Sequence, residues 1–193
     1  MHDADYAGHT DAVILVGGRG TRLRPLTVST PKPMLPTAGY PFLRHLLARI
    51  AAAGMRHVVL GTSYKAEVFE DYFGDGSELG LEIDYVVEEE ALGTGGAIRN
   101  VADKLRYDTA MVFNGDVLSG ADLGAILHTH TSGGADVTMH LVRVPDPRAF
   151  GSVPTDERGR VLEFLEKTED PPTDQINAGC YVFRREVIDE IPA

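Results

Sequence analysis

The stretch that decides the fold is AVILVGGRGTRLRP, residues 12–25. Residues 12–16 are apolar and rich in β-branched side chains, which is typical of a buried strand. Gly17, Gly18 and Gly20 follow at the point where a sheet opens toward a ligand, and glycines let the main chain approach phosphate oxygens closely. The stretch therefore predicts a loop that holds a nucleoside triphosphate. On their own, the glycines are equally consistent with a tight turn.

The charge distribution favours the phosphate-binding interpretation. No Asp or Glu occurs between Asp11 and Glu67, and Arg22 and Lys32 lie in this interval. Arginine meets phosphate through a planar fork, and lysine does so as a compact cation. The chain has a net charge of −11, which disfavours nucleic acid as a partner and indicates a focused anion site. The other basic residues of the interval are Arg19, Arg24, Arg44, Arg49, Arg56 and Lys65.

Length and composition indicate a globular protein without a membrane partner. The 193 residues are 43% hydrophobic, and no apolar run approaches the ~20 residues of a spanning helix. A single cysteine excludes an internal disulfide framework, and the first residues do not resemble a signal peptide, so we expect a cytoplasmic protein. We expect residues 1–10 to be an N-terminal extension and residues 11–193 to form one domain.

Strand and helix patterns alternate along most of the chain, which predicts an α/β fold with a mainly parallel, mixed sheet flanked by helices. Near the end, residues 150–154 and 161–166 flank a polar turn and predict an antiparallel hairpin. The other predicted strands are 12–16, 57–61, 81–87, 109–113, 136–144 and 177–183, and the predicted helices are 41–53, 65–73, 94–105, 121–130 and 186–191.

Asn114-Gly115-Asp116 follows an apolar strand, so its side chains are expected at the carboxyl edge of the sheet. The Asp116 carboxylate is suited to Mg²⁺ whose other ligands are phosphate oxygens and water. An aspartate that ends a strand in an ordinary Asn-Gly turn is the alternative.

A second glycine loop follows a predicted strand. Gly93 and its neighbours can admit a flat base against the main chain, and the following helix offers free N–H groups. Thr94 has the alternative role of a helix N-cap, and Glu88 to Glu90 that of a solvated acidic surface.

Small or polar residues also end the later strand-like runs. Glu166 and Asn177 can hydrogen-bond sugar hydroxyls, and Lys167 can neutralise a sugar phosphate. Together with Gly151 they predict a second pocket, although ordinary hairpin residues remain an equal alternative.

Taken together, these motifs resemble the sugar-1-phosphate nucleotidylyltransferase family, and especially its mannose-1-phosphate guanylyltransferase (GDP-mannose pyrophosphorylase) branch. The resemblance covers nearly the whole chain. It is carried by residues 15–27, 31–34, 88–89, 92–94, 114–116, 150–151, 166–167 and 176–179.

The resemblance implies a Rossmann-like nucleotidyltransferase fold and transfer of GMP from GTP to mannose 1-phosphate, giving GDP-mannose and pyrophosphate with Mg²⁺ as cofactor. It implies catalytic roles for Arg22, Lys32 and Asp116, with Asp116 as the metal ligand. The implied nucleotide-binding residues are Leu15, Gly17, Gly18, Gly20, Thr21, Arg22, Lys32, Gly93 and Asn114, and the implied sugar-phosphate-binding residues are Gly151, Glu166, Lys167 and Asn177.

One departure from the family pattern leaves alternatives open. The family carries a second metal-binding aspartate in a later Trp-x-Asp-x-Gly motif, and this sequence contains no tryptophan, so we expect domain 11–193 to be incomplete at its C-terminal end. The alternatives are a nucleotidylyltransferase that uses dTTP or UTP with glucose 1-phosphate, a non-catalytic regulatory subunit that binds GDP-mannose, and a glycosyltransferase. The oligomeric state is also open, with a homo-oligomer among the options.

Overall fold

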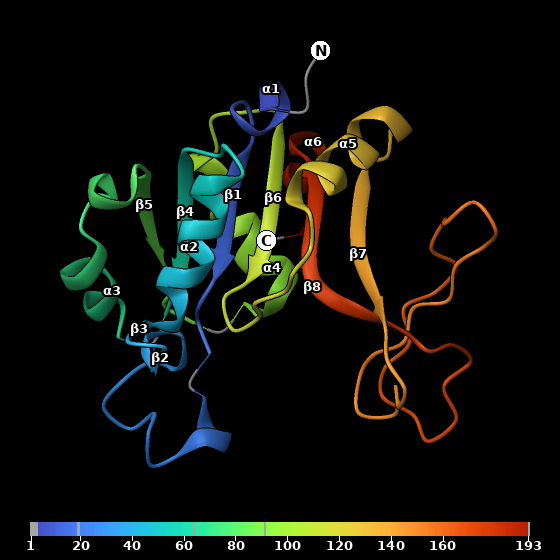
Figure 1. Cartoon of the computed structure of the whole chain (residues 1–193), viewed down its shortest axis with the longest axis horizontal. Coiled ribbons are helices and arrows are strands. Elements are labelled where there is room, and N and C mark those ends of the chain that lie inside the picture. Colours follow the sequence, from blue (N-terminus) through green and yellow to red (C-terminus); the bar gives the residue numbers. More distant parts are fainter. Residues whose placement is uncertain (1–3, 19, 64, 91, 193) are drawn as a thin grey trace. The chain divides into compact units, whose positions relative to one another are not determined.

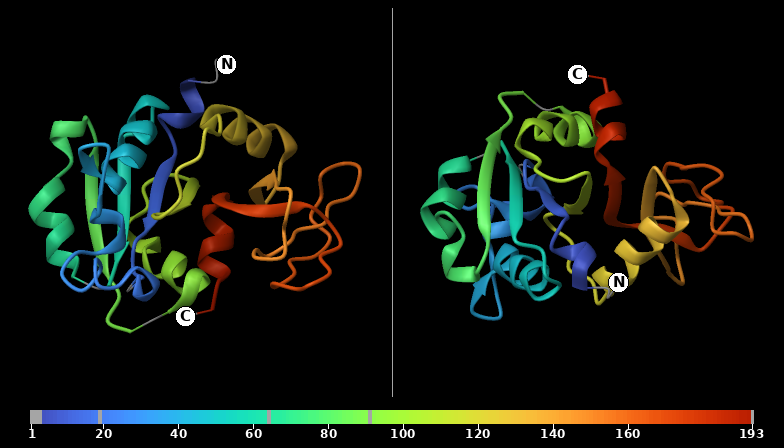
Figure 2. Two further views of the ribbon diagram at one scale, coloured as in Figure 1. Left: turned by 60° about the horizontal axis from the view of Figure 1, so that its bottom comes forward. Right: turned by 90° about the horizontal axis from the view of Figure 1, so that it is seen from above.

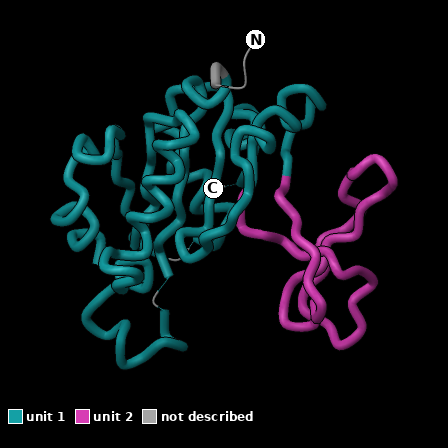
Figure 3. Tube along the Cα trace, in the orientation of Figure 1, with its two compact units in different colours: residues 1–138, 181–193 teal, residues 139–180 magenta. Residues whose placement is uncertain are grey.

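The computed structural model describes residues 4–18, 20–63, 65–90 and 92–192, and the chain divides into two compact units (Figure 3). Unit 1 comprises residues 1–138 and 181–193, and unit 2 comprises residues 139–180. The elements in chain order (Figure 1) are α1 (Ala4–Ala7), β1 (Asp11–Leu15), the 3-10 turns η1 (Thr21–Leu23) and η2 (Lys32–Met34), β2 (Pro36–Thr37), β3 (Tyr40–Pro41), α2 (Phe42–Ala52), β4 (His57–Thr62), α3 (Ala66–Phe73), η3 (Ser77–Leu79), β5 (Glu82–Val87), α4 (Gly93–Asn100), η4 (Ala102–Lys104), β6 (Thr109–Asn114), α5 (Leu123–Gly133), β7 (Val137–Arg143), β8 (Gln175–Arg184) and α6 (Arg185–Glu190). None of the helices in these described ranges is long and apolar enough to cross a membrane.

Six strands form one sheet in the order β5-β4-β1-β6-β8-β7 (Figure 1). The pairs β4–β5, β1–β4 and β1–β6 are parallel, and Leu15 at the end of β1 lies opposite Gly61 on one side and Asn114 on the other. From β1 the chain runs outward to β4 and β5 and then returns to the other side of β1 as β6. This reversal places a crevice at the carboxyl ends of β1 and β6, where open α/β sheets bind ligands. The predicted α/β fold with a mixed, mainly parallel sheet is confirmed.

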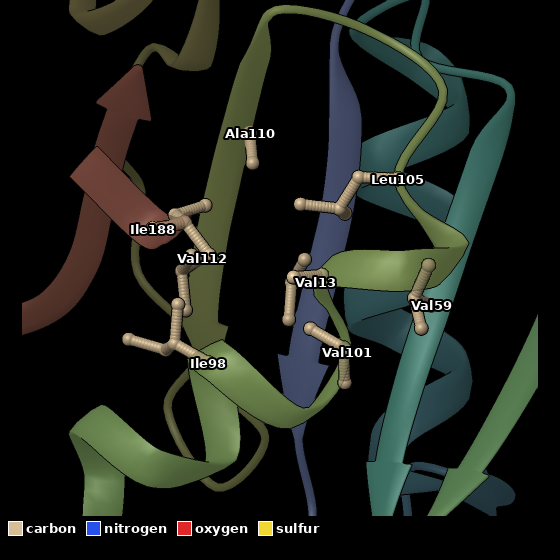
Figure 4. Close-up of a cluster of buried hydrophobic side chains, with 9 residues drawn as sticks. Val13, Val59, Ile98, Val101, Leu105, Ala110, Val112 and Ile188 are labelled. Carbon is tan, nitrogen blue, oxygen red and sulfur yellow. The ribbon is translucent and has the colours of Figure 1, made fainter. Parts of the chain in front are cut away.

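Helices cover both faces of the central strands. In Figure 2, α4 and α6 lie on one side of β1 and β4, and α2 lies on the other. Successive strand residues point to opposite faces, so Val13 packs toward α4 while Ile14 packs toward α2. The cluster on the α4 face (Figure 4) consists of Val13, Val59, Ile98, Val101, Ala102, Leu105, Ala110, Val112 and Ile188. α2 contributes the buried side chains Leu43, Leu46, Leu47 and Ile50, at the spacing that predicted this helix.

A buried ionic network ties together the amino ends of the strands in unit 1. Asp11 is fully buried and accepts hydrogen bonds from Nδ1 of His57 at 2.6 Å and from the backbone N–H groups of Arg106 and Tyr107 at 2.8 Å each. Nε2 of His57 contacts the Asp84 carboxylate at 3.1 Å. Burial lowers the pKa of His57, but the hydrogen bonds to the two carboxylates outweigh it, and the pKa is raised above its ordinary value of 6.5.

Two local predictions need correction. The helix predicted over 94–105 ends at Asn100 and is followed by the 3-10 turn η4, since Asn100 and β-branched Val101 both have low helix propensity. The hairpin predicted for 150–154 and 161–166 has the expected antiparallel direction, but it consists of isolated bridges instead of continuous strands. The reason is that Ser152 bridges both Leu165 and Ile176, which divides the pairing between two segments.

Candidate active site

A cavity of about 490 Å³ lies in unit 1 at the carboxyl ends of the parallel strands. Its wall is built from the segments that follow β1, β4, β5 and β6, together with the start of α4. The predicted residues that line it are Leu15, Gly17, Gly18, Gly20, Arg22, Lys32, Gly93, Asn114 and Asp116. Thr21, an exposed residue that opens η1, is absent from this wall as far as the described residues define it. Arg19, part of the predicted motif, falls outside the described residues.

The glycine loop follows β1, and its residues Gly17, Gly18 and Gly20 line the cavity. The carbonyl of Gly17 accepts a hydrogen bond from Oγ of Ser63, which follows β4. Gly18 is exposed, and a Cβ added there would meet no atom within 4 Å, so its main chain is open to a ligand. Gly20 has the left-handed φ of 57° that favours glycine, and it is the N-cap residue of η1.

Lys32 and Asp116 meet at the cavity although they lie 84 residues apart in sequence. Lys32 is the first residue of the 3-10 turn η2. Pro31 precedes it, and the proline ring fixes the backbone angle φ at the start of this turn. Nζ of Lys32 lies 2.6 Å from Oδ2 of Asp116. The side chains are 38% and 45% exposed, so solvent screens the pair and both partners can reach a ligand.

Gly115 determines where its two polar neighbours lie. Its N–H donates to the carbonyl of Leu15 at 2.9 Å, which fastens the end of β6 to the end of β1. A Cβ on residue 115 would meet Cγ1 of Val16 and, at 2.8 Å, the carbonyl oxygen of Leu15. Only glycine permits this approach, which brings Asn114 and Asp116 to the wall of the cavity.

Glu88 is a cavity residue that the sequence reasoning left as part of a solvated acidic surface. It follows β5, and its N–H donates to the carbonyl of Thr62 at 2.7 Å. Burial raises the pKa of the Glu88 carboxyl, and a hydrogen bond from the N–H of Leu92 opposes that rise. One carboxylate oxygen would lie 3.7 Å from a Cβ built on Gly17, so this carboxylate is close to the glycine loop. Its neighbours Glu89 and Glu90 are exposed.

Other cavity residues were given no role from the sequence. Most of them lie within the motifs described above, whereas Ser63 lies in none and reaches the cavity through the register of β4 against β1. Ser63 is the clearest case, since a single serine after a strand carries no signal of its own. The full set of cavity residues not predicted is Val16, Leu23, Pro33, Ser63, Glu88, Thr94 and Ala97.

The start of α4 forms the remaining wall. Gly93 is the first helical residue and Leu92 is the N-cap, with no side-chain hydrogen bond at the cap. The interpretation of Thr94 as the N-cap is therefore wrong, because the helix begins one residue earlier, where Gly93 adopts a φ of 69°. Without a capping side chain, the first N–H groups of α4 remain available to a ligand.

The predicted sugar-phosphate residues lie in unit 2. A Cβ on Gly151 would meet the carbonyl of Leu165 at 3.1 Å, so glycine permits close approach of the segment that carries Glu166 and Lys167. Both charged side chains are exposed. Oδ1 of Asn177 accepts a hydrogen bond from the N–H of Gly179 at 2.9 Å. The two bridges of Ser152 bring the segments of these residues side by side within the unit.

Comparison with known families decides what kind of protein carries this cavity. A family model described as nucleotidyl transferase matches residues 11–193. The chain belongs to this family.

Relatives within the nucleotidyl transferase family include guanylyltransferases. The chain is 76% identical over 182 residues to the mannose-1-phosphate guanylyltransferase of Mycobacterium tuberculosis, covering 94% of this chain and 51% of that protein. It is 37% identical to the D-glycero-α-D-manno-heptose 1-phosphate guanylyltransferase of Aneurinibacillus thermoaerophilus, covering 93% of this chain and 76% of that protein. The chain spans about half the length of several curated relatives that it matches.

A solved structure of similar fold is that of HddC from Yersinia pseudotuberculosis complexed with GMP-PN. The two chains superpose with a TM-score of 0.82 at 32% identity, covering 95% of this nucleotidyl transferase and 80% of HddC. The predicted Rossmann-like nucleotidyltransferase fold is confirmed.

Proposed function

We propose that this chain carries the nucleotide-binding part of a mannose-1-phosphate guanylyltransferase. A phosphate oxygen of mannose 1-phosphate attacks the α-phosphorus of GTP, a new P–O bond forms, and the bond to the β-phosphate breaks. GDP-mannose and pyrophosphate leave. The observation that carries the proposal is a single cavity that combines the glycine loop with Arg22, Lys32 and Asp116, in a chain 76% identical to a named guanylyltransferase.

The triphosphate is assigned to the loop and its cations. Arg22 and Lys32 offset the negative charge that shifts onto the leaving pyrophosphate, and they align it for in-line transfer. Gly17 and Gly18 give the phosphates access to main-chain N–H groups. The nucleotide contacts proposed in addition are Leu15, Gly20, Thr21, Gly93 and Asn114.

The donor set suits Mg²⁺ bound partly by the substrate. Asp116 offers one exposed carboxylate at the cavity, and the described residues contain no group of three or more His, Cys, Asp or Glu that would cage a metal. One protein carboxylate plus phosphate oxygens and water is a usual arrangement for Mg²⁺. When bound through Asp116, Mg²⁺ supplies charge neutralisation to the phosphates.

The carboxylate of Glu88 supports the assignment of guanine, and not uracil or thymine, as the base that this cavity recognises. The Watson–Crick edge of guanine presents two adjacent N–H donors, whereas uracil and thymine present one N–H between two carbonyl oxygens. A carboxylate only accepts hydrogen bonds when ionised, so it complements the first edge and repels the carbonyls of the second. Glu88 is a carboxylate of the cavity wall beside the second glycine loop.

For the sugar phosphate we propose the unit 2 residues Gly151, Glu166, Lys167 and Asn177. Lys167 neutralises the phosphate, and Glu166 and Asn177 hydrogen-bond the sugar hydroxyls. Glycine at position 151 keeps the neighbouring segment close.

Pyrophosphate release by the protein expressed from its complete coding sequence tests the proposal. Release is expected only when GTP, mannose 1-phosphate and Mg²⁺ are all present, and Lys32→Ala should lower kcat/KM by about 100-fold or more, the usual cost of one preorganised contact to developing charge. A preference for UTP or dTTP would overturn the guanylyl assignment. Tight binding of GDP-mannose without turnover would instead identify a regulatory subunit.

A further inference from the structure

The two groups proposed to bind different parts of the metal–nucleotide complex are paired with each other. Nζ of Lys32 lies 2.6 Å from Oδ2 of Asp116, at the wall of the cavity. Under the proposed function, on which this inference rests, Lys32 belongs to the triphosphate and Asp116 to the divalent cation. To bind, the triphosphate therefore has to separate Lys32 from Asp116, and the cation has to separate Asp116 from Lys32.

We propose that the Lys32–Asp116 pair is an electrostatic latch that makes triphosphate and divalent cation bind cooperatively. A cation that arrives alone has to displace the Lys32 ammonium from Asp116 and remain beside a like charge. A triphosphate that arrives alone has to draw Lys32 away and remain beside an uncompensated Asp116 carboxylate. When both ligands arrive, Lys32 exchanges Asp116 for phosphate, and Asp116 exchanges Lys32 for the cation. Neither residue is then left beside a like charge or without an opposite charge.

The surroundings of the pair support this exchange. Arg22 lines the same cavity, and no hydrogen bond or ion pair of its side chain is found among the described residues. A triphosphate can therefore engage Arg22 before Lys32 is released. The pair is also partly exposed, and exposed ion pairs are weak enough to open at small cost.

Reciprocity makes the proposal quantitative. The factor by which the metal raises triphosphate affinity must equal the factor by which triphosphate raises metal affinity. Direct coordination of the metal by phosphate contributes to this factor in every variant. The latch adds a further contribution that disappears when either residue of the pair loses its charge.

The first arm of the test measures Mn²⁺ alone, by electron paramagnetic resonance, with no nucleotide present. Lys32→Met should bind Mn²⁺ about three- to tenfold more tightly than the wild type, and Lys32→Arg, which keeps a cation, should not. Lys104→Met is the matched control, because it removes the same charge from η4, whose lysine does not line the cavity. Equal Mn²⁺ affinity in the wild type and Lys32→Met would overturn the latch.

The second arm measures GTP binding in EDTA by calorimetry. Loss of a metal ligand ordinarily weakens nucleotide binding, but the latch predicts the opposite in the absence of metal. Asp116→Asn should bind metal-free GTP about three- to fivefold more tightly than the wild type, because Lys32 is already released. Asp103→Asn, an exposed aspartate of η4, controls for the general loss of negative charge. Unchanged or weaker binding by Asp116→Asn would contradict the proposal.

Failure of the latch and failure of the proposed function give different results. If GTP does not bind but UTP or dTTP does, the guanylyl assignment fails and the second arm is repeated with that nucleotide. If no nucleotide binds, the function fails, and the Mn²⁺ measurement still decides whether Lys32 competes for Asp116. Circular dichroism of each variant verifies that the fold is retained.

Discussion

The hydroxyl of Thr27 donates a hydrogen bond to the carbonyl of Gly20 at 2.8 Å, and its methyl carbon would lie 3.0 Å from a Cβ added to Gly20. Thr27 is 2% exposed although most of its neighbours in the loop are solvent-exposed. It therefore acts as an internal support for the glycine loop. The same Cβ would lie 3.2 Å from Cβ of Lys32, so glycine at position 20 allows the loop to lie close to the lysine.

Removing the Thr27 hydroxyl should weaken nucleotide binding more than it weakens the fold. Thr27→Val leaves the Gly20 carbonyl without its donor, a loss of about 1 kcal/mol for a typical hydrogen bond. We expect about a fivefold rise in the GTP dissociation constant, measured by calorimetry with Mg²⁺. Thr27→Ser keeps the hydroxyl and should stay close to wild type; equal behaviour of the two variants would contradict the supporting role.

Gly115 should tolerate no side chain. Gly115→Ala forces a methyl group against Val16 and Leu15, and overpacking of this kind costs about 1–3 kcal/mol. Urea unfolding should show this loss, and activity should fall because Asp116 shifts. Gly120→Ala is the matched control, since a Cβ there would meet no atom within 4 Å and its φ is not left-handed. Similar stability of the two variants would refute the steric argument.

Glu88→Gln should reduce the preference for GTP over UTP by about tenfold, because a good two-point contact to a base discriminates by ~1–3 kcal/mol. The measurement is the ratio of kcat/KM for the two nucleotides. Glu89→Gln, which changes an adjacent exposed carboxylate, should leave the ratio unchanged.

The same ratio should depend on pH. Burial raises the pKa of Glu88 above its ordinary 4.5, so its carboxylate becomes protonated at a higher pH than an exposed glutamate would. The GTP preference should decline as the pH falls through this raised pKa. A ratio that is flat with pH would exclude Glu88 from base recognition.

His57 should make stability depend on pH in the neutral range. Its pKa is raised in the folded protein, so the folded state binds the proton more tightly than the unfolded state does. The stabilisation is complete below the ordinary pKa of 6.5 and is lost as the pH rises through the folded value.

As the pH rises through this range, His57 should lower the urea midpoint of the wild type relative to that of His57→Gln, which keeps only the opposite contribution of His130 and His140, whose pKa values burial lowers. The variant should also lose about 3 kcal/mol at low pH, because it leaves the Asp11 carboxylate buried without its cation. His128→Gln, on the exposed side of α5, should retain the wild-type profile.

Local patterns in the sequence predicted most strands and helices of unit 1, because each has a clear apolar period and its own boundary signals. The spacing of Leu43, Leu46, Leu47 and Ile50 is an example. The glycine loop and the strand-ending Asp116 were predicted to share one edge of the sheet, and they do.

What sequence reasoning missed depends on contacts between distant segments. Ser63 and Glu88 reach the cavity only because β4 pairs with β1, and β5 with β4, in a particular register. The Lys32–Asp116 pair joins residues 84 positions apart, and no local pattern encodes it. The segment 150–166 reads as a regular hairpin, but Ser152 shares its pairing with Ile176.

Strand β1 begins at Asp11, in the buried ionic network, and ends at Leu15, on the cavity wall. At about 3.3 Å per residue, its two ends are about 13 Å apart, farther than the ~7–10 Å within which substitutions usually couple. Substitutions at one end should therefore combine additively with substitutions at the other. Thermal robustness and substrate choice can then be engineered, or drift during evolution, as independent traits of one short strand.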